Sequence, residues 1–200
     1  MTASNSYLER STVGADSGRN RHQFLRFSLQ PGLTALIEIE RTIELVNIPT
    51  DRIVPMPHLP PAVRGVYNWR GEILWIVDLA LLLGLSGSTQ SYRSVQPTIV
   101  LSSGGEVDLL QRSPVATTAV PTVKTIGFIV DEIVEIEWCE LDPNSSGALP
   151  ADLHPELAQW VSGVWESPDG EDLLILDGQA ILERADFHAD ARSDLNYFFR

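Results

Sequence analysis

The residues of this sequence that could bind a metal or attack a substrate are four histidines and a single cysteine. A zinc site usually needs paired Cys or His ligands at short spacing, but the histidines are scattered, at His22, His58, His154 and His188. Cys139 stands beside Glu140, whose negative charge raises a thiol pKa and so disfavours a nucleophile. We therefore expect no metal site, no cofactor and a structural cysteine.

Carboxylates are the other candidates for chemistry, since two of them can act as general acid and general base. Acids are adjacent at Asp131 and Glu132 and alternate at Glu135 and Glu137. Alternate residues of a strand share one face, so we interpret Glu135 and Glu137 as a solvated strand face. The sequence has no Walker loop, no G-x-G-x-x-G, no H-E-x-x-H and no G-x-S-x-G. We expect a protein that is not an enzyme.

The segment GVYNWRG, residues 65–71, is a better candidate for a binding site. It places Asn68 and Arg70 in a predicted tight turn that does not itself require arginine. Arginine offers a planar fork of five donors, and Trp69 adds a large ring, and both types are enriched at interface hot spots. The alternative is that Arg70 pairs inside the fold, with Glu72 or Glu44.

Charge is distributed unevenly along the chain. The 27 acidic and 14 basic residues give a formal net charge of −13. Residues 1–100 hold 8 acids and 9 bases, a net of +1, whereas residues 101–200 hold 19 acids and 5 bases, a net of −14. A chain this acidic repels nucleic acid phosphates. We expect no nucleic acid partner, and any anionic partner should meet the first half.

The location of the protein is suggested by what the sequence lacks. A lone cysteine forms no internal disulfide, which suits a reducing compartment. Residues 1–21 have no apolar run of the kind a signal peptide needs, and we interpret them as a disordered tail. The longest apolar stretch, residues 73–85, is too short to span a bilayer. We expect a cytoplasmic protein without membrane insertion.

The local pattern predicts a mainly β chain with short helices. Pro31-Gly32 indicates a hairpin between two apolar runs. Asp78 and Asp177 stand where side chains would cap helices over residues 79–85 and 178–184. Apolar residues at helical spacing predict a docking helix over residues 186–200. Strands are expected at residues 23–29, 33–39, 43–48, 63–68, 72–77, 96–102, 123–130, 133–138, 158–165 and 172–176.

The sequence also resembles itself. IEIERTIEL, residues 37–45, lies over FIVDEIVEI, residues 128–136, at an offset of 91. Further on, GVY, RGE and IVD recur as GVW, DGE and ILD at offsets of 98 to 99. We expect two similar β units, one over about residues 22–100 and one over about 123–185, joined by a flexible loop at 103–122. Each unit is small for a free core, so the units should pack together with a groove between them.

These segments resemble the CheW family of chemotaxis adaptor proteins. The resemblance covers about residues 22–185 and rests on IERTIEL, HLPPAVRGVYNWRGEILWIVDL, IGFIVDEIVEI and SGVWESPDGEDLLILD. It implies two SH3-like five-stranded β-barrel subdomains with short helices. It also implies a non-catalytic coupler between the regulatory domain of a CheA-type histidine kinase and methyl-accepting chemoreceptors, recruited to receptor arrays at the inner membrane.

The family's partner-binding positions carry over by motif. Two of them, Thr42 and Glu44, match its receptor-contacting stretch. The others match its N-x-R-G segment and are Gly65, Asn68, Arg70 and Gly71. The chain departs from the family at Trp75, where proline is usual, in the 103–122 insertion and in the added tail. The kinase also carries such a domain, but 200 residues leave no room for its catalytic parts.

Two questions stay open at this level. The chain could instead be a small-molecule-binding β protein or an unrecognised hydrolase with an acidic pocket, which would require a closed cavity with perturbed carboxylates. The behaviour that an adaptor would control could also be pilus-driven motility or phototaxis instead of flagellar swimming.

Overall fold

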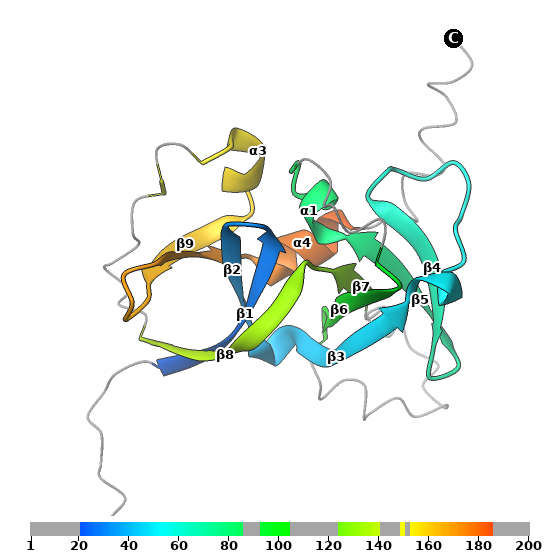
Figure 1. The fold of residues 1–200 in the computed structure, drawn as a ribbon, viewed down its shortest axis with the longest axis horizontal. Helices are drawn as coiled ribbons and strands as arrows, with labels where there is room; N and C mark the ends of the chain where they lie inside the picture. Colours follow the sequence, from blue (N-terminus) through cyan, green and yellow to red (C-terminus); the bar gives the residue numbers. More distant parts are fainter. Residues whose placement is uncertain (1–20, 86–92, 105–123, 141–148, 151–152, 186–200) are drawn as a thin grey trace, which may run out of the picture.

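A computed structural model describes residues 21–85, 93–104, 124–140, 149–150 and 153–185 (Figure 1). The described chain forms two five-stranded sheets. Sheet 1 has the order β8 (Glu132–Glu140), β1 (Arg21–Gln30), β2 (Leu33–Glu38), β10 (Asp172–Leu176) and β9 (Val161–Glu166). Sheet 2 has the order β3 (Thr42–Pro49), β6 (Val95–Ser102), β7 (Thr125–Ile129), β5 (Glu72–Asp78) and β4 (Val63–Trp69). The prediction of a mainly β, two-subdomain fold is confirmed.

Short helices begin at the predicted caps. Asp78 accepts a hydrogen bond from the backbone N–H of Leu81 at the start of α1 (Leu79–Leu82). Asp177 does the same for two N–H groups of α4 (Gly178–Arg184). Another short helix, α3 (Pro155–Ala158), precedes β9, and the 3₁₀ turns η1 (Ile39–Arg41) and η2 (Thr50–Arg52) flank β3. Both aspartates therefore have the structural role that the sequence predicts.

The two repeats exchange strands, which the sequence did not predict. Sheet 1 takes β1 and β2 from the first repeat and β8 to β10 from the second, and sheet 2 takes the complement. Replacing β1 to β5 by β6 to β10 converts one strand order into the other. The boundaries expected at about 22–100 and 123–185 are therefore not those of the sheets. The reason lies in two parallel ladders, β2 with β10 and β5 with β7, which join strands of different repeats.

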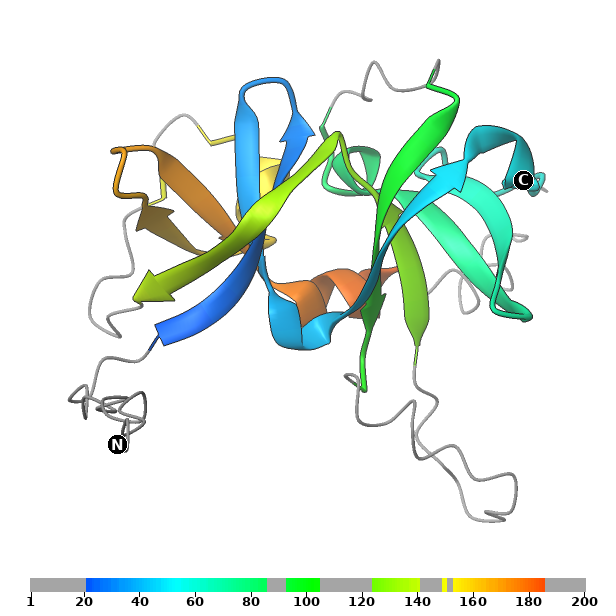
Figure 2. The same ribbon diagram turned by 60° about the horizontal axis from the view of Figure 1, so that its bottom comes forward.

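The aligned segments 37–45 and 128–136 are the places where the chain changes sheets. In the first, η1 carries the chain from β2 to β3. In the second, a turn at Val130 and Asp131 carries it from β7 to β8. Figure 2 shows the two sheets side by side, with β3 and β8 along their facing edges and α4 below them. The internal repeat therefore relates the two segments in which the chain passes from one sheet to the other.

Each sheet curls without its two outer strands pairing within the described residues. In sheet 2 the chain that leaves β3 passes η2 and makes one antiparallel bridge to β4, between Val54 and Val66. This bridge consists of two backbone hydrogen bonds of 2.8 and 2.9 Å. It brings the far end of β3 round to β4, which gives the sheet its barrel-like form.

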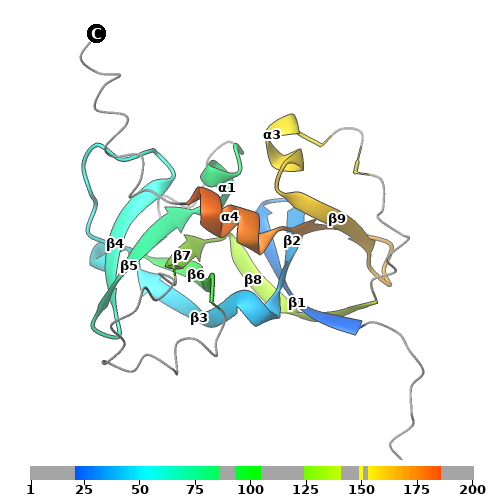
Figure 3. The same ribbon diagram turned by 180° about the vertical axis from the view of Figure 1, so that it is seen from behind.

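Three apolar cores hold the sheets together. The largest lies between the sheets and includes Leu25, Phe27, Phe128 and Ile181 of α4. Figure 3, the view from behind, shows α4 in front of the place where the two sheets meet. Each sheet also has its own smaller core of buried strand side chains. In sheet 2 these are Ile48, Trp69, Leu74, Ile76, Val100 and Ile129. In sheet 1 they are Phe24, Leu36, Cys139, Leu173 and Ile175.

Several expected segments lie outside the described residues: the tail up to residue 20, most of the 103–122 loop and the helix at 186–200. Among the residues that are described, no helix is long and apolar enough to cross a membrane.

Candidate functional site

The turn between β4 and β5 presents the predicted binding residues. Trp69 pairs with Glu72, so Arg70 and Gly71 form a two-residue hairpin loop. Both loop residues have positive φ, 54° for Arg70 and 86° for Gly71, which is the geometry of a type I′ turn. The side-chain oxygen of Asn68 accepts a hydrogen bond of 3.0 Å from the Gly71 N–H. The N-x-R-G segment therefore builds its own turn.

Arginine is an unfavourable residue at the first position of such a turn. A side chain in the left-handed region costs about 1 kcal/mol, and asparagine or glycine is usual there. Residues with strained backbone conformations cluster at functional sites, where the function of the side chain offsets the cost of the strain. The side chain of Arg70 remains 67% exposed. The turn thus holds a long cation out from the end of sheet 2.

Glu44 of β3 contacts both Trp69 and Arg70 and holds their side chains in place. Its carboxylate accepts a 2.6 Å hydrogen bond from the indole N–H of Trp69 and lies 3.1 Å from the Arg70 guanidinium. The guanidinium also stands 5.1 Å from the centre of the Trp69 ring, within the range of a cation–π contact. The sequence left open whether Arg70 pairs with Glu44 or with Glu72, and the structure shows the ion pair with Glu44.

Thr42 and Gly65 have different surroundings from this cluster. Gly65 has a φ of 141°, and a Cβ there would overlap the carbonyl of Val54, so glycine is needed where the chain bridges β3 and β4. Thr42 begins β3 beside a register shift, and its buried hydroxyl has no hydrogen-bond partner among the residues that the structure describes. The structure thus joins Glu44, Asn68, Arg70 and Gly71 and gives Gly65 a packing role.

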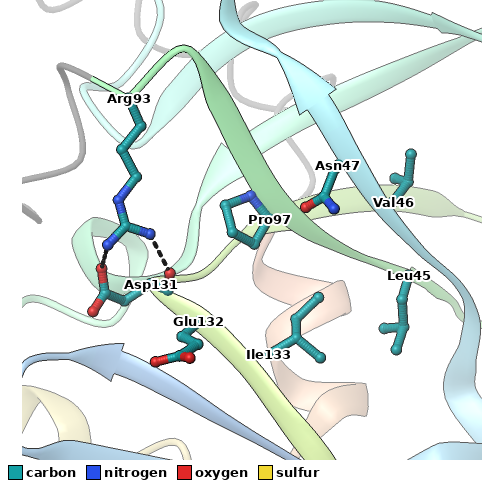
Figure 4. A pocket seen from close by; sticks show the side chains of 8 residues that line it. All are labelled: Leu45, Val46, Asn47, Arg93, Pro97, Asp131, Glu132 and Ile133. Atoms are coloured by element: carbon teal, nitrogen blue, oxygen red, sulfur yellow. Dashed lines mark hydrogen bonds and ion pairs between the residues drawn. The ribbon is translucent and has the colours of Figure 1, made fainter.

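An open groove of about 540 Å³ runs between the two sheets (Figure 4). Leu45 and Asn47 of β3 line one side, and Glu132 and Ile133 at the start of β8 line the other. Arg93 closes one end, where it donates 2.7 Å to the Asp131 carbonyl and pairs with the Asp131 carboxylate at 3.1 Å. The groove that the repeats predicted is therefore present, with partly apolar walls and a charged end.

A second, smaller hollow of about 230 Å³ lies against β4 and β6. Its carboxylate, Asp78, is buried, caps α1 and pairs with Arg64 at 2.8 Å. This carboxylate is held by structural contacts, so the hollow does not have the arrangement expected of an acid–base site. No group of three or more His, Cys, Asp or Glu side chains capable of holding a metal occurs in the part of the chain that the structure describes.

The acids of β8 do not all form the solvated face that the sequence predicted. Glu137 is partly buried and pairs with Arg26 of β1 at 3.2 Å, and Arg26 also reaches Glu171 at 2.6 Å. Glu135 is exposed, as predicted, and the opposite face also carries exposed side chains: Val134, Ile136 and Trp138. The reason is that Glu137 pairs across with Phe24 and so points to the inside of sheet 1. An alternating pattern of acids and apolar residues fits either orientation.

Cys139 points the same way as Glu137 and is fully buried. Burial raises the pKa of its thiol to about 12, and the charge of Glu137 adds to the effect. The sequence attributed this influence to Glu140, but alternate residues share a face, and Glu140 points away to Arg21. A thiol with this pKa stays protonated at neutral pH, which agrees with a structural cysteine.

Comparison with known proteins identifies this architecture. A family model described as the CheW-like domain matches residues 23–186. The chain belongs to the CheW-like family. The scaffolding protein TtCheW from Thermoanaerobacter tengcongensis has a similar structure, with 20% sequence identity and a TM-score of 0.57 over 81% of this chain and 92% of that one. That likeness concerns the fold. No curated protein matches the chain.

Proposed function

We propose that this CheW-like protein is a non-catalytic adaptor of chemotaxis-type two-component signalling. It couples the regulatory domain of a CheA-type histidine kinase to methyl-accepting chemoreceptors. The observation that carries the proposal is the open, partly apolar groove between the facing edges of the two sheets. A groove of this form suits a helical partner better than a small substrate, because small ligands are usually enclosed on most sides.

The groove is the surface we assign to the receptor. A receptor helical hairpin presents an apolar stripe with polar flanks, and the groove offers Leu45 and Ile133 as apolar walls beside Asn47. The Arg93–Asp131 pair marks the charged end and sets a direction along the groove. Membership of the family supports this assignment.

The turn of Arg70 is the surface we assign to partner recognition at the end of sheet 2. Its guanidinium is oriented by Glu44 and Trp69 yet mostly exposed, so one face of the fork is available to a partner. An arginine held in place before binding loses little side-chain entropy when a partner binds, and such residues are typical of interface hot spots. Binding at such surfaces transmits the receptor's state without a chemical step, and the protein acts in the cytoplasm at receptor arrays. Whether the output is flagellar, pilus-driven or phototactic motility does not alter this biochemistry.

The groove is tested by a charged substitution on its wall. We expect Leu45→Asp to fold normally and to bind a receptor hairpin at least tenfold more weakly than wild type, while its affinity for the kinase regulatory domain stays unchanged. Val95→Asp is the matched control, because Val95 of β6 is a similarly exposed apolar side chain (40% against 41%) that does not line the groove. Equal receptor affinity for wild type and Leu45→Asp would remove the groove from the proposal.

A further inference from the structure

One carboxylate at the charged end of the groove has no partner among the described residues. Three of the eight side chains that line the groove are charged: Arg93, Asp131 and Glu132. The two terminal amino groups of the Arg93 guanidinium both contact Asp131, one at the carbonyl and the other at the carboxylate. Glu132 is exposed, and within the described part of the chain its carboxylate makes no hydrogen bond or ion pair. The groove therefore keeps one negative charge that the fold does not neutralise.

The position of Glu132 is fixed by the segment in which the chain passes from sheet 2 to sheet 1. Glu132 begins β8, where it pairs with Ser28 of β1, and the N–H of Asp131 donates 2.8 Å to the Ser28 carbonyl. Figure 4 shows the side chain of Glu132 between the Arg93–Asp131 pair and Ile133. Ile133 packs against the central core. The backbone that carries the carboxylate is thus held in place before any partner binds.

The surroundings of Glu132 favour a positively charged partner. Glu135, also exposed, follows three residues along β8, while Arg93 is occupied by Asp131. Residues 101–200 carry a net charge of −14. An acidic surface of this kind raises the local concentration of cationic partners and speeds their encounter. Charge complementarity therefore points to a basic group opposite Glu132.

We propose that Glu132 pairs with a lysine or arginine of the receptor hairpin that occupies the groove. This inference rests on the proposed function and names the charge that the groove selects. One turn of a helix rises about 5.4 Å, and consecutive strand residues lie about 3.8 Å apart. A partner helix with an apolar side chain on Ile133 would thus bring a residue three or four positions away close to Glu132. That residue is the basic one.

The pair gives the groove a means of discrimination that its apolar walls lack. Leu45 and Ile133 accept any apolar side chain of suitable size, since apolar contacts are not directional. A hairpin with an acidic residue opposite Glu132 would instead place two like charges together, which disfavours binding. Glu132 is thus a specificity-determining residue, and the apolar walls supply the contact area.

The test measures the affinity of the full chain for a receptor hairpin from the same genome at two salt concentrations. At about 50 mM salt we expect Glu132→Lys to bind at least about tenfold more weakly than wild type. At about 500 mM the difference should shrink to about threefold or less, because ions screen exposed charges. Glu135→Lys is the matched control, with the same change in net charge on the same strand but outside the groove lining, and should lose less than about threefold. Thermal unfolding checks that the variants are folded.

A second arm identifies the partner residue by charge reversal. Each exposed basic residue of the hairpin is changed in turn to glutamate, and every variant is titrated with wild type and with Glu132→Lys. We expect one hairpin variant to bind wild type weakly and to regain affinity for Glu132→Lys, since the reversed charges again attract. Failure of every hairpin variant to regain affinity would contradict a direct pair.

The outcomes separate this inference from the function on which it rests. Equal affinity of wild type and Glu132→Lys for the hairpin at about 50 mM salt would overturn the inference and leave receptor binding intact. Equal losses for Glu132→Lys and Glu135→Lys would overturn it too, because they would reflect the overall charge of the protein. A wild-type protein that binds no hairpin would contradict the receptor assignment itself, and the inference with it.

Discussion

The guanidinium of Arg70 lies 3.1 Å from the carboxylate of Glu44, although Arg70 lies in the turn after β4 and Glu44 on β3, and these two strands are at opposite ends of the strand order of sheet 2. The indole of Trp69 donates to the same carboxylate. This contact links the β4–β5 turn to β3, so the edge strand that lines the groove also positions the exposed arginine. The turn and the groove are therefore linked through β3.

Removing the Arg70 side chain should affect binding and leave the fold intact. We expect Arg70→Ala to weaken partner binding by about 2 kcal/mol, near thirtyfold in Kd, since a buried interface anchor typically contributes this much. Its unfolding free energy should change by less than about 1 kcal/mol, because the ion pair is mostly exposed. Titration and thermal unfolding measure the two effects. Arg52→Ala, an exposed arginine of η2, is the control. Unfolding of Arg70→Ala would show a structural role instead.

The turn itself makes a separate prediction about stability. Gly71 has a φ of 86° and open space around it, so Gly71→Ala should destabilise the protein by about 1 kcal/mol through backbone strain alone. Gly163→Ala in β9 should cost less than about 0.5 kcal/mol, because its Cβ would meet Ile175 at an ordinary 3.9 Å. Chemical denaturation compares the two variants, and equal losses would contradict the type I′ assignment.

The equivalent caps of the two repeats should differ in importance. Asp78 is 2% exposed and both caps α1 and pairs with Arg64, whereas Asp177 caps α4 from an exposed position. We expect Asp78→Ala to lower the unfolding free energy by about 3 kcal/mol, since it also strips a partner from a charged group. Asp177→Ala should lower it by about 1 kcal/mol. A larger loss for Asp177→Ala in denaturant titrations would refute this ranking.

Cys139 should make the protein sensitive to high pH. Its thiol pKa is raised from 9.0 to about 12 on folding, so above pH 9 the unfolded chain loses a proton that the folded chain keeps. Stability must then fall as the pH rises from 9 to 12, by at most about 1.4 kcal/mol per unit for this group. Unfolding followed against pH should show the decline reduced in Cys139→Ala. Parallel curves for the two proteins would mean that the thiol is not responsible.

Local features were accessible from the sequence, and partner choice between distant strands was not. The Arg70-Gly71 turn and the Asp78 and Asp177 caps follow from residue types at short range, and the repeat follows from direct alignment. Strand exchange was missed because alternation in a strand specifies its faces but not its neighbours. The orientation of β8 was missed for the same reason, since the burial of Cys139 and the Arg26–Glu137 pair depend on the neighbouring strand β1.

The central claim is that this protein joins two partners at once. The direct measurement is a titration of the purified full chain with a CheA-type regulatory domain and a receptor hairpin from the same genome, separately and together. The account predicts that the wild-type protein binds each partner and forms a ternary complex with both. It predicts that Leu45→Asp loses the receptor hairpin but still binds the kinase domain. A folded protein that binds neither partner would contradict the adaptor function and leave family membership as a statement about fold.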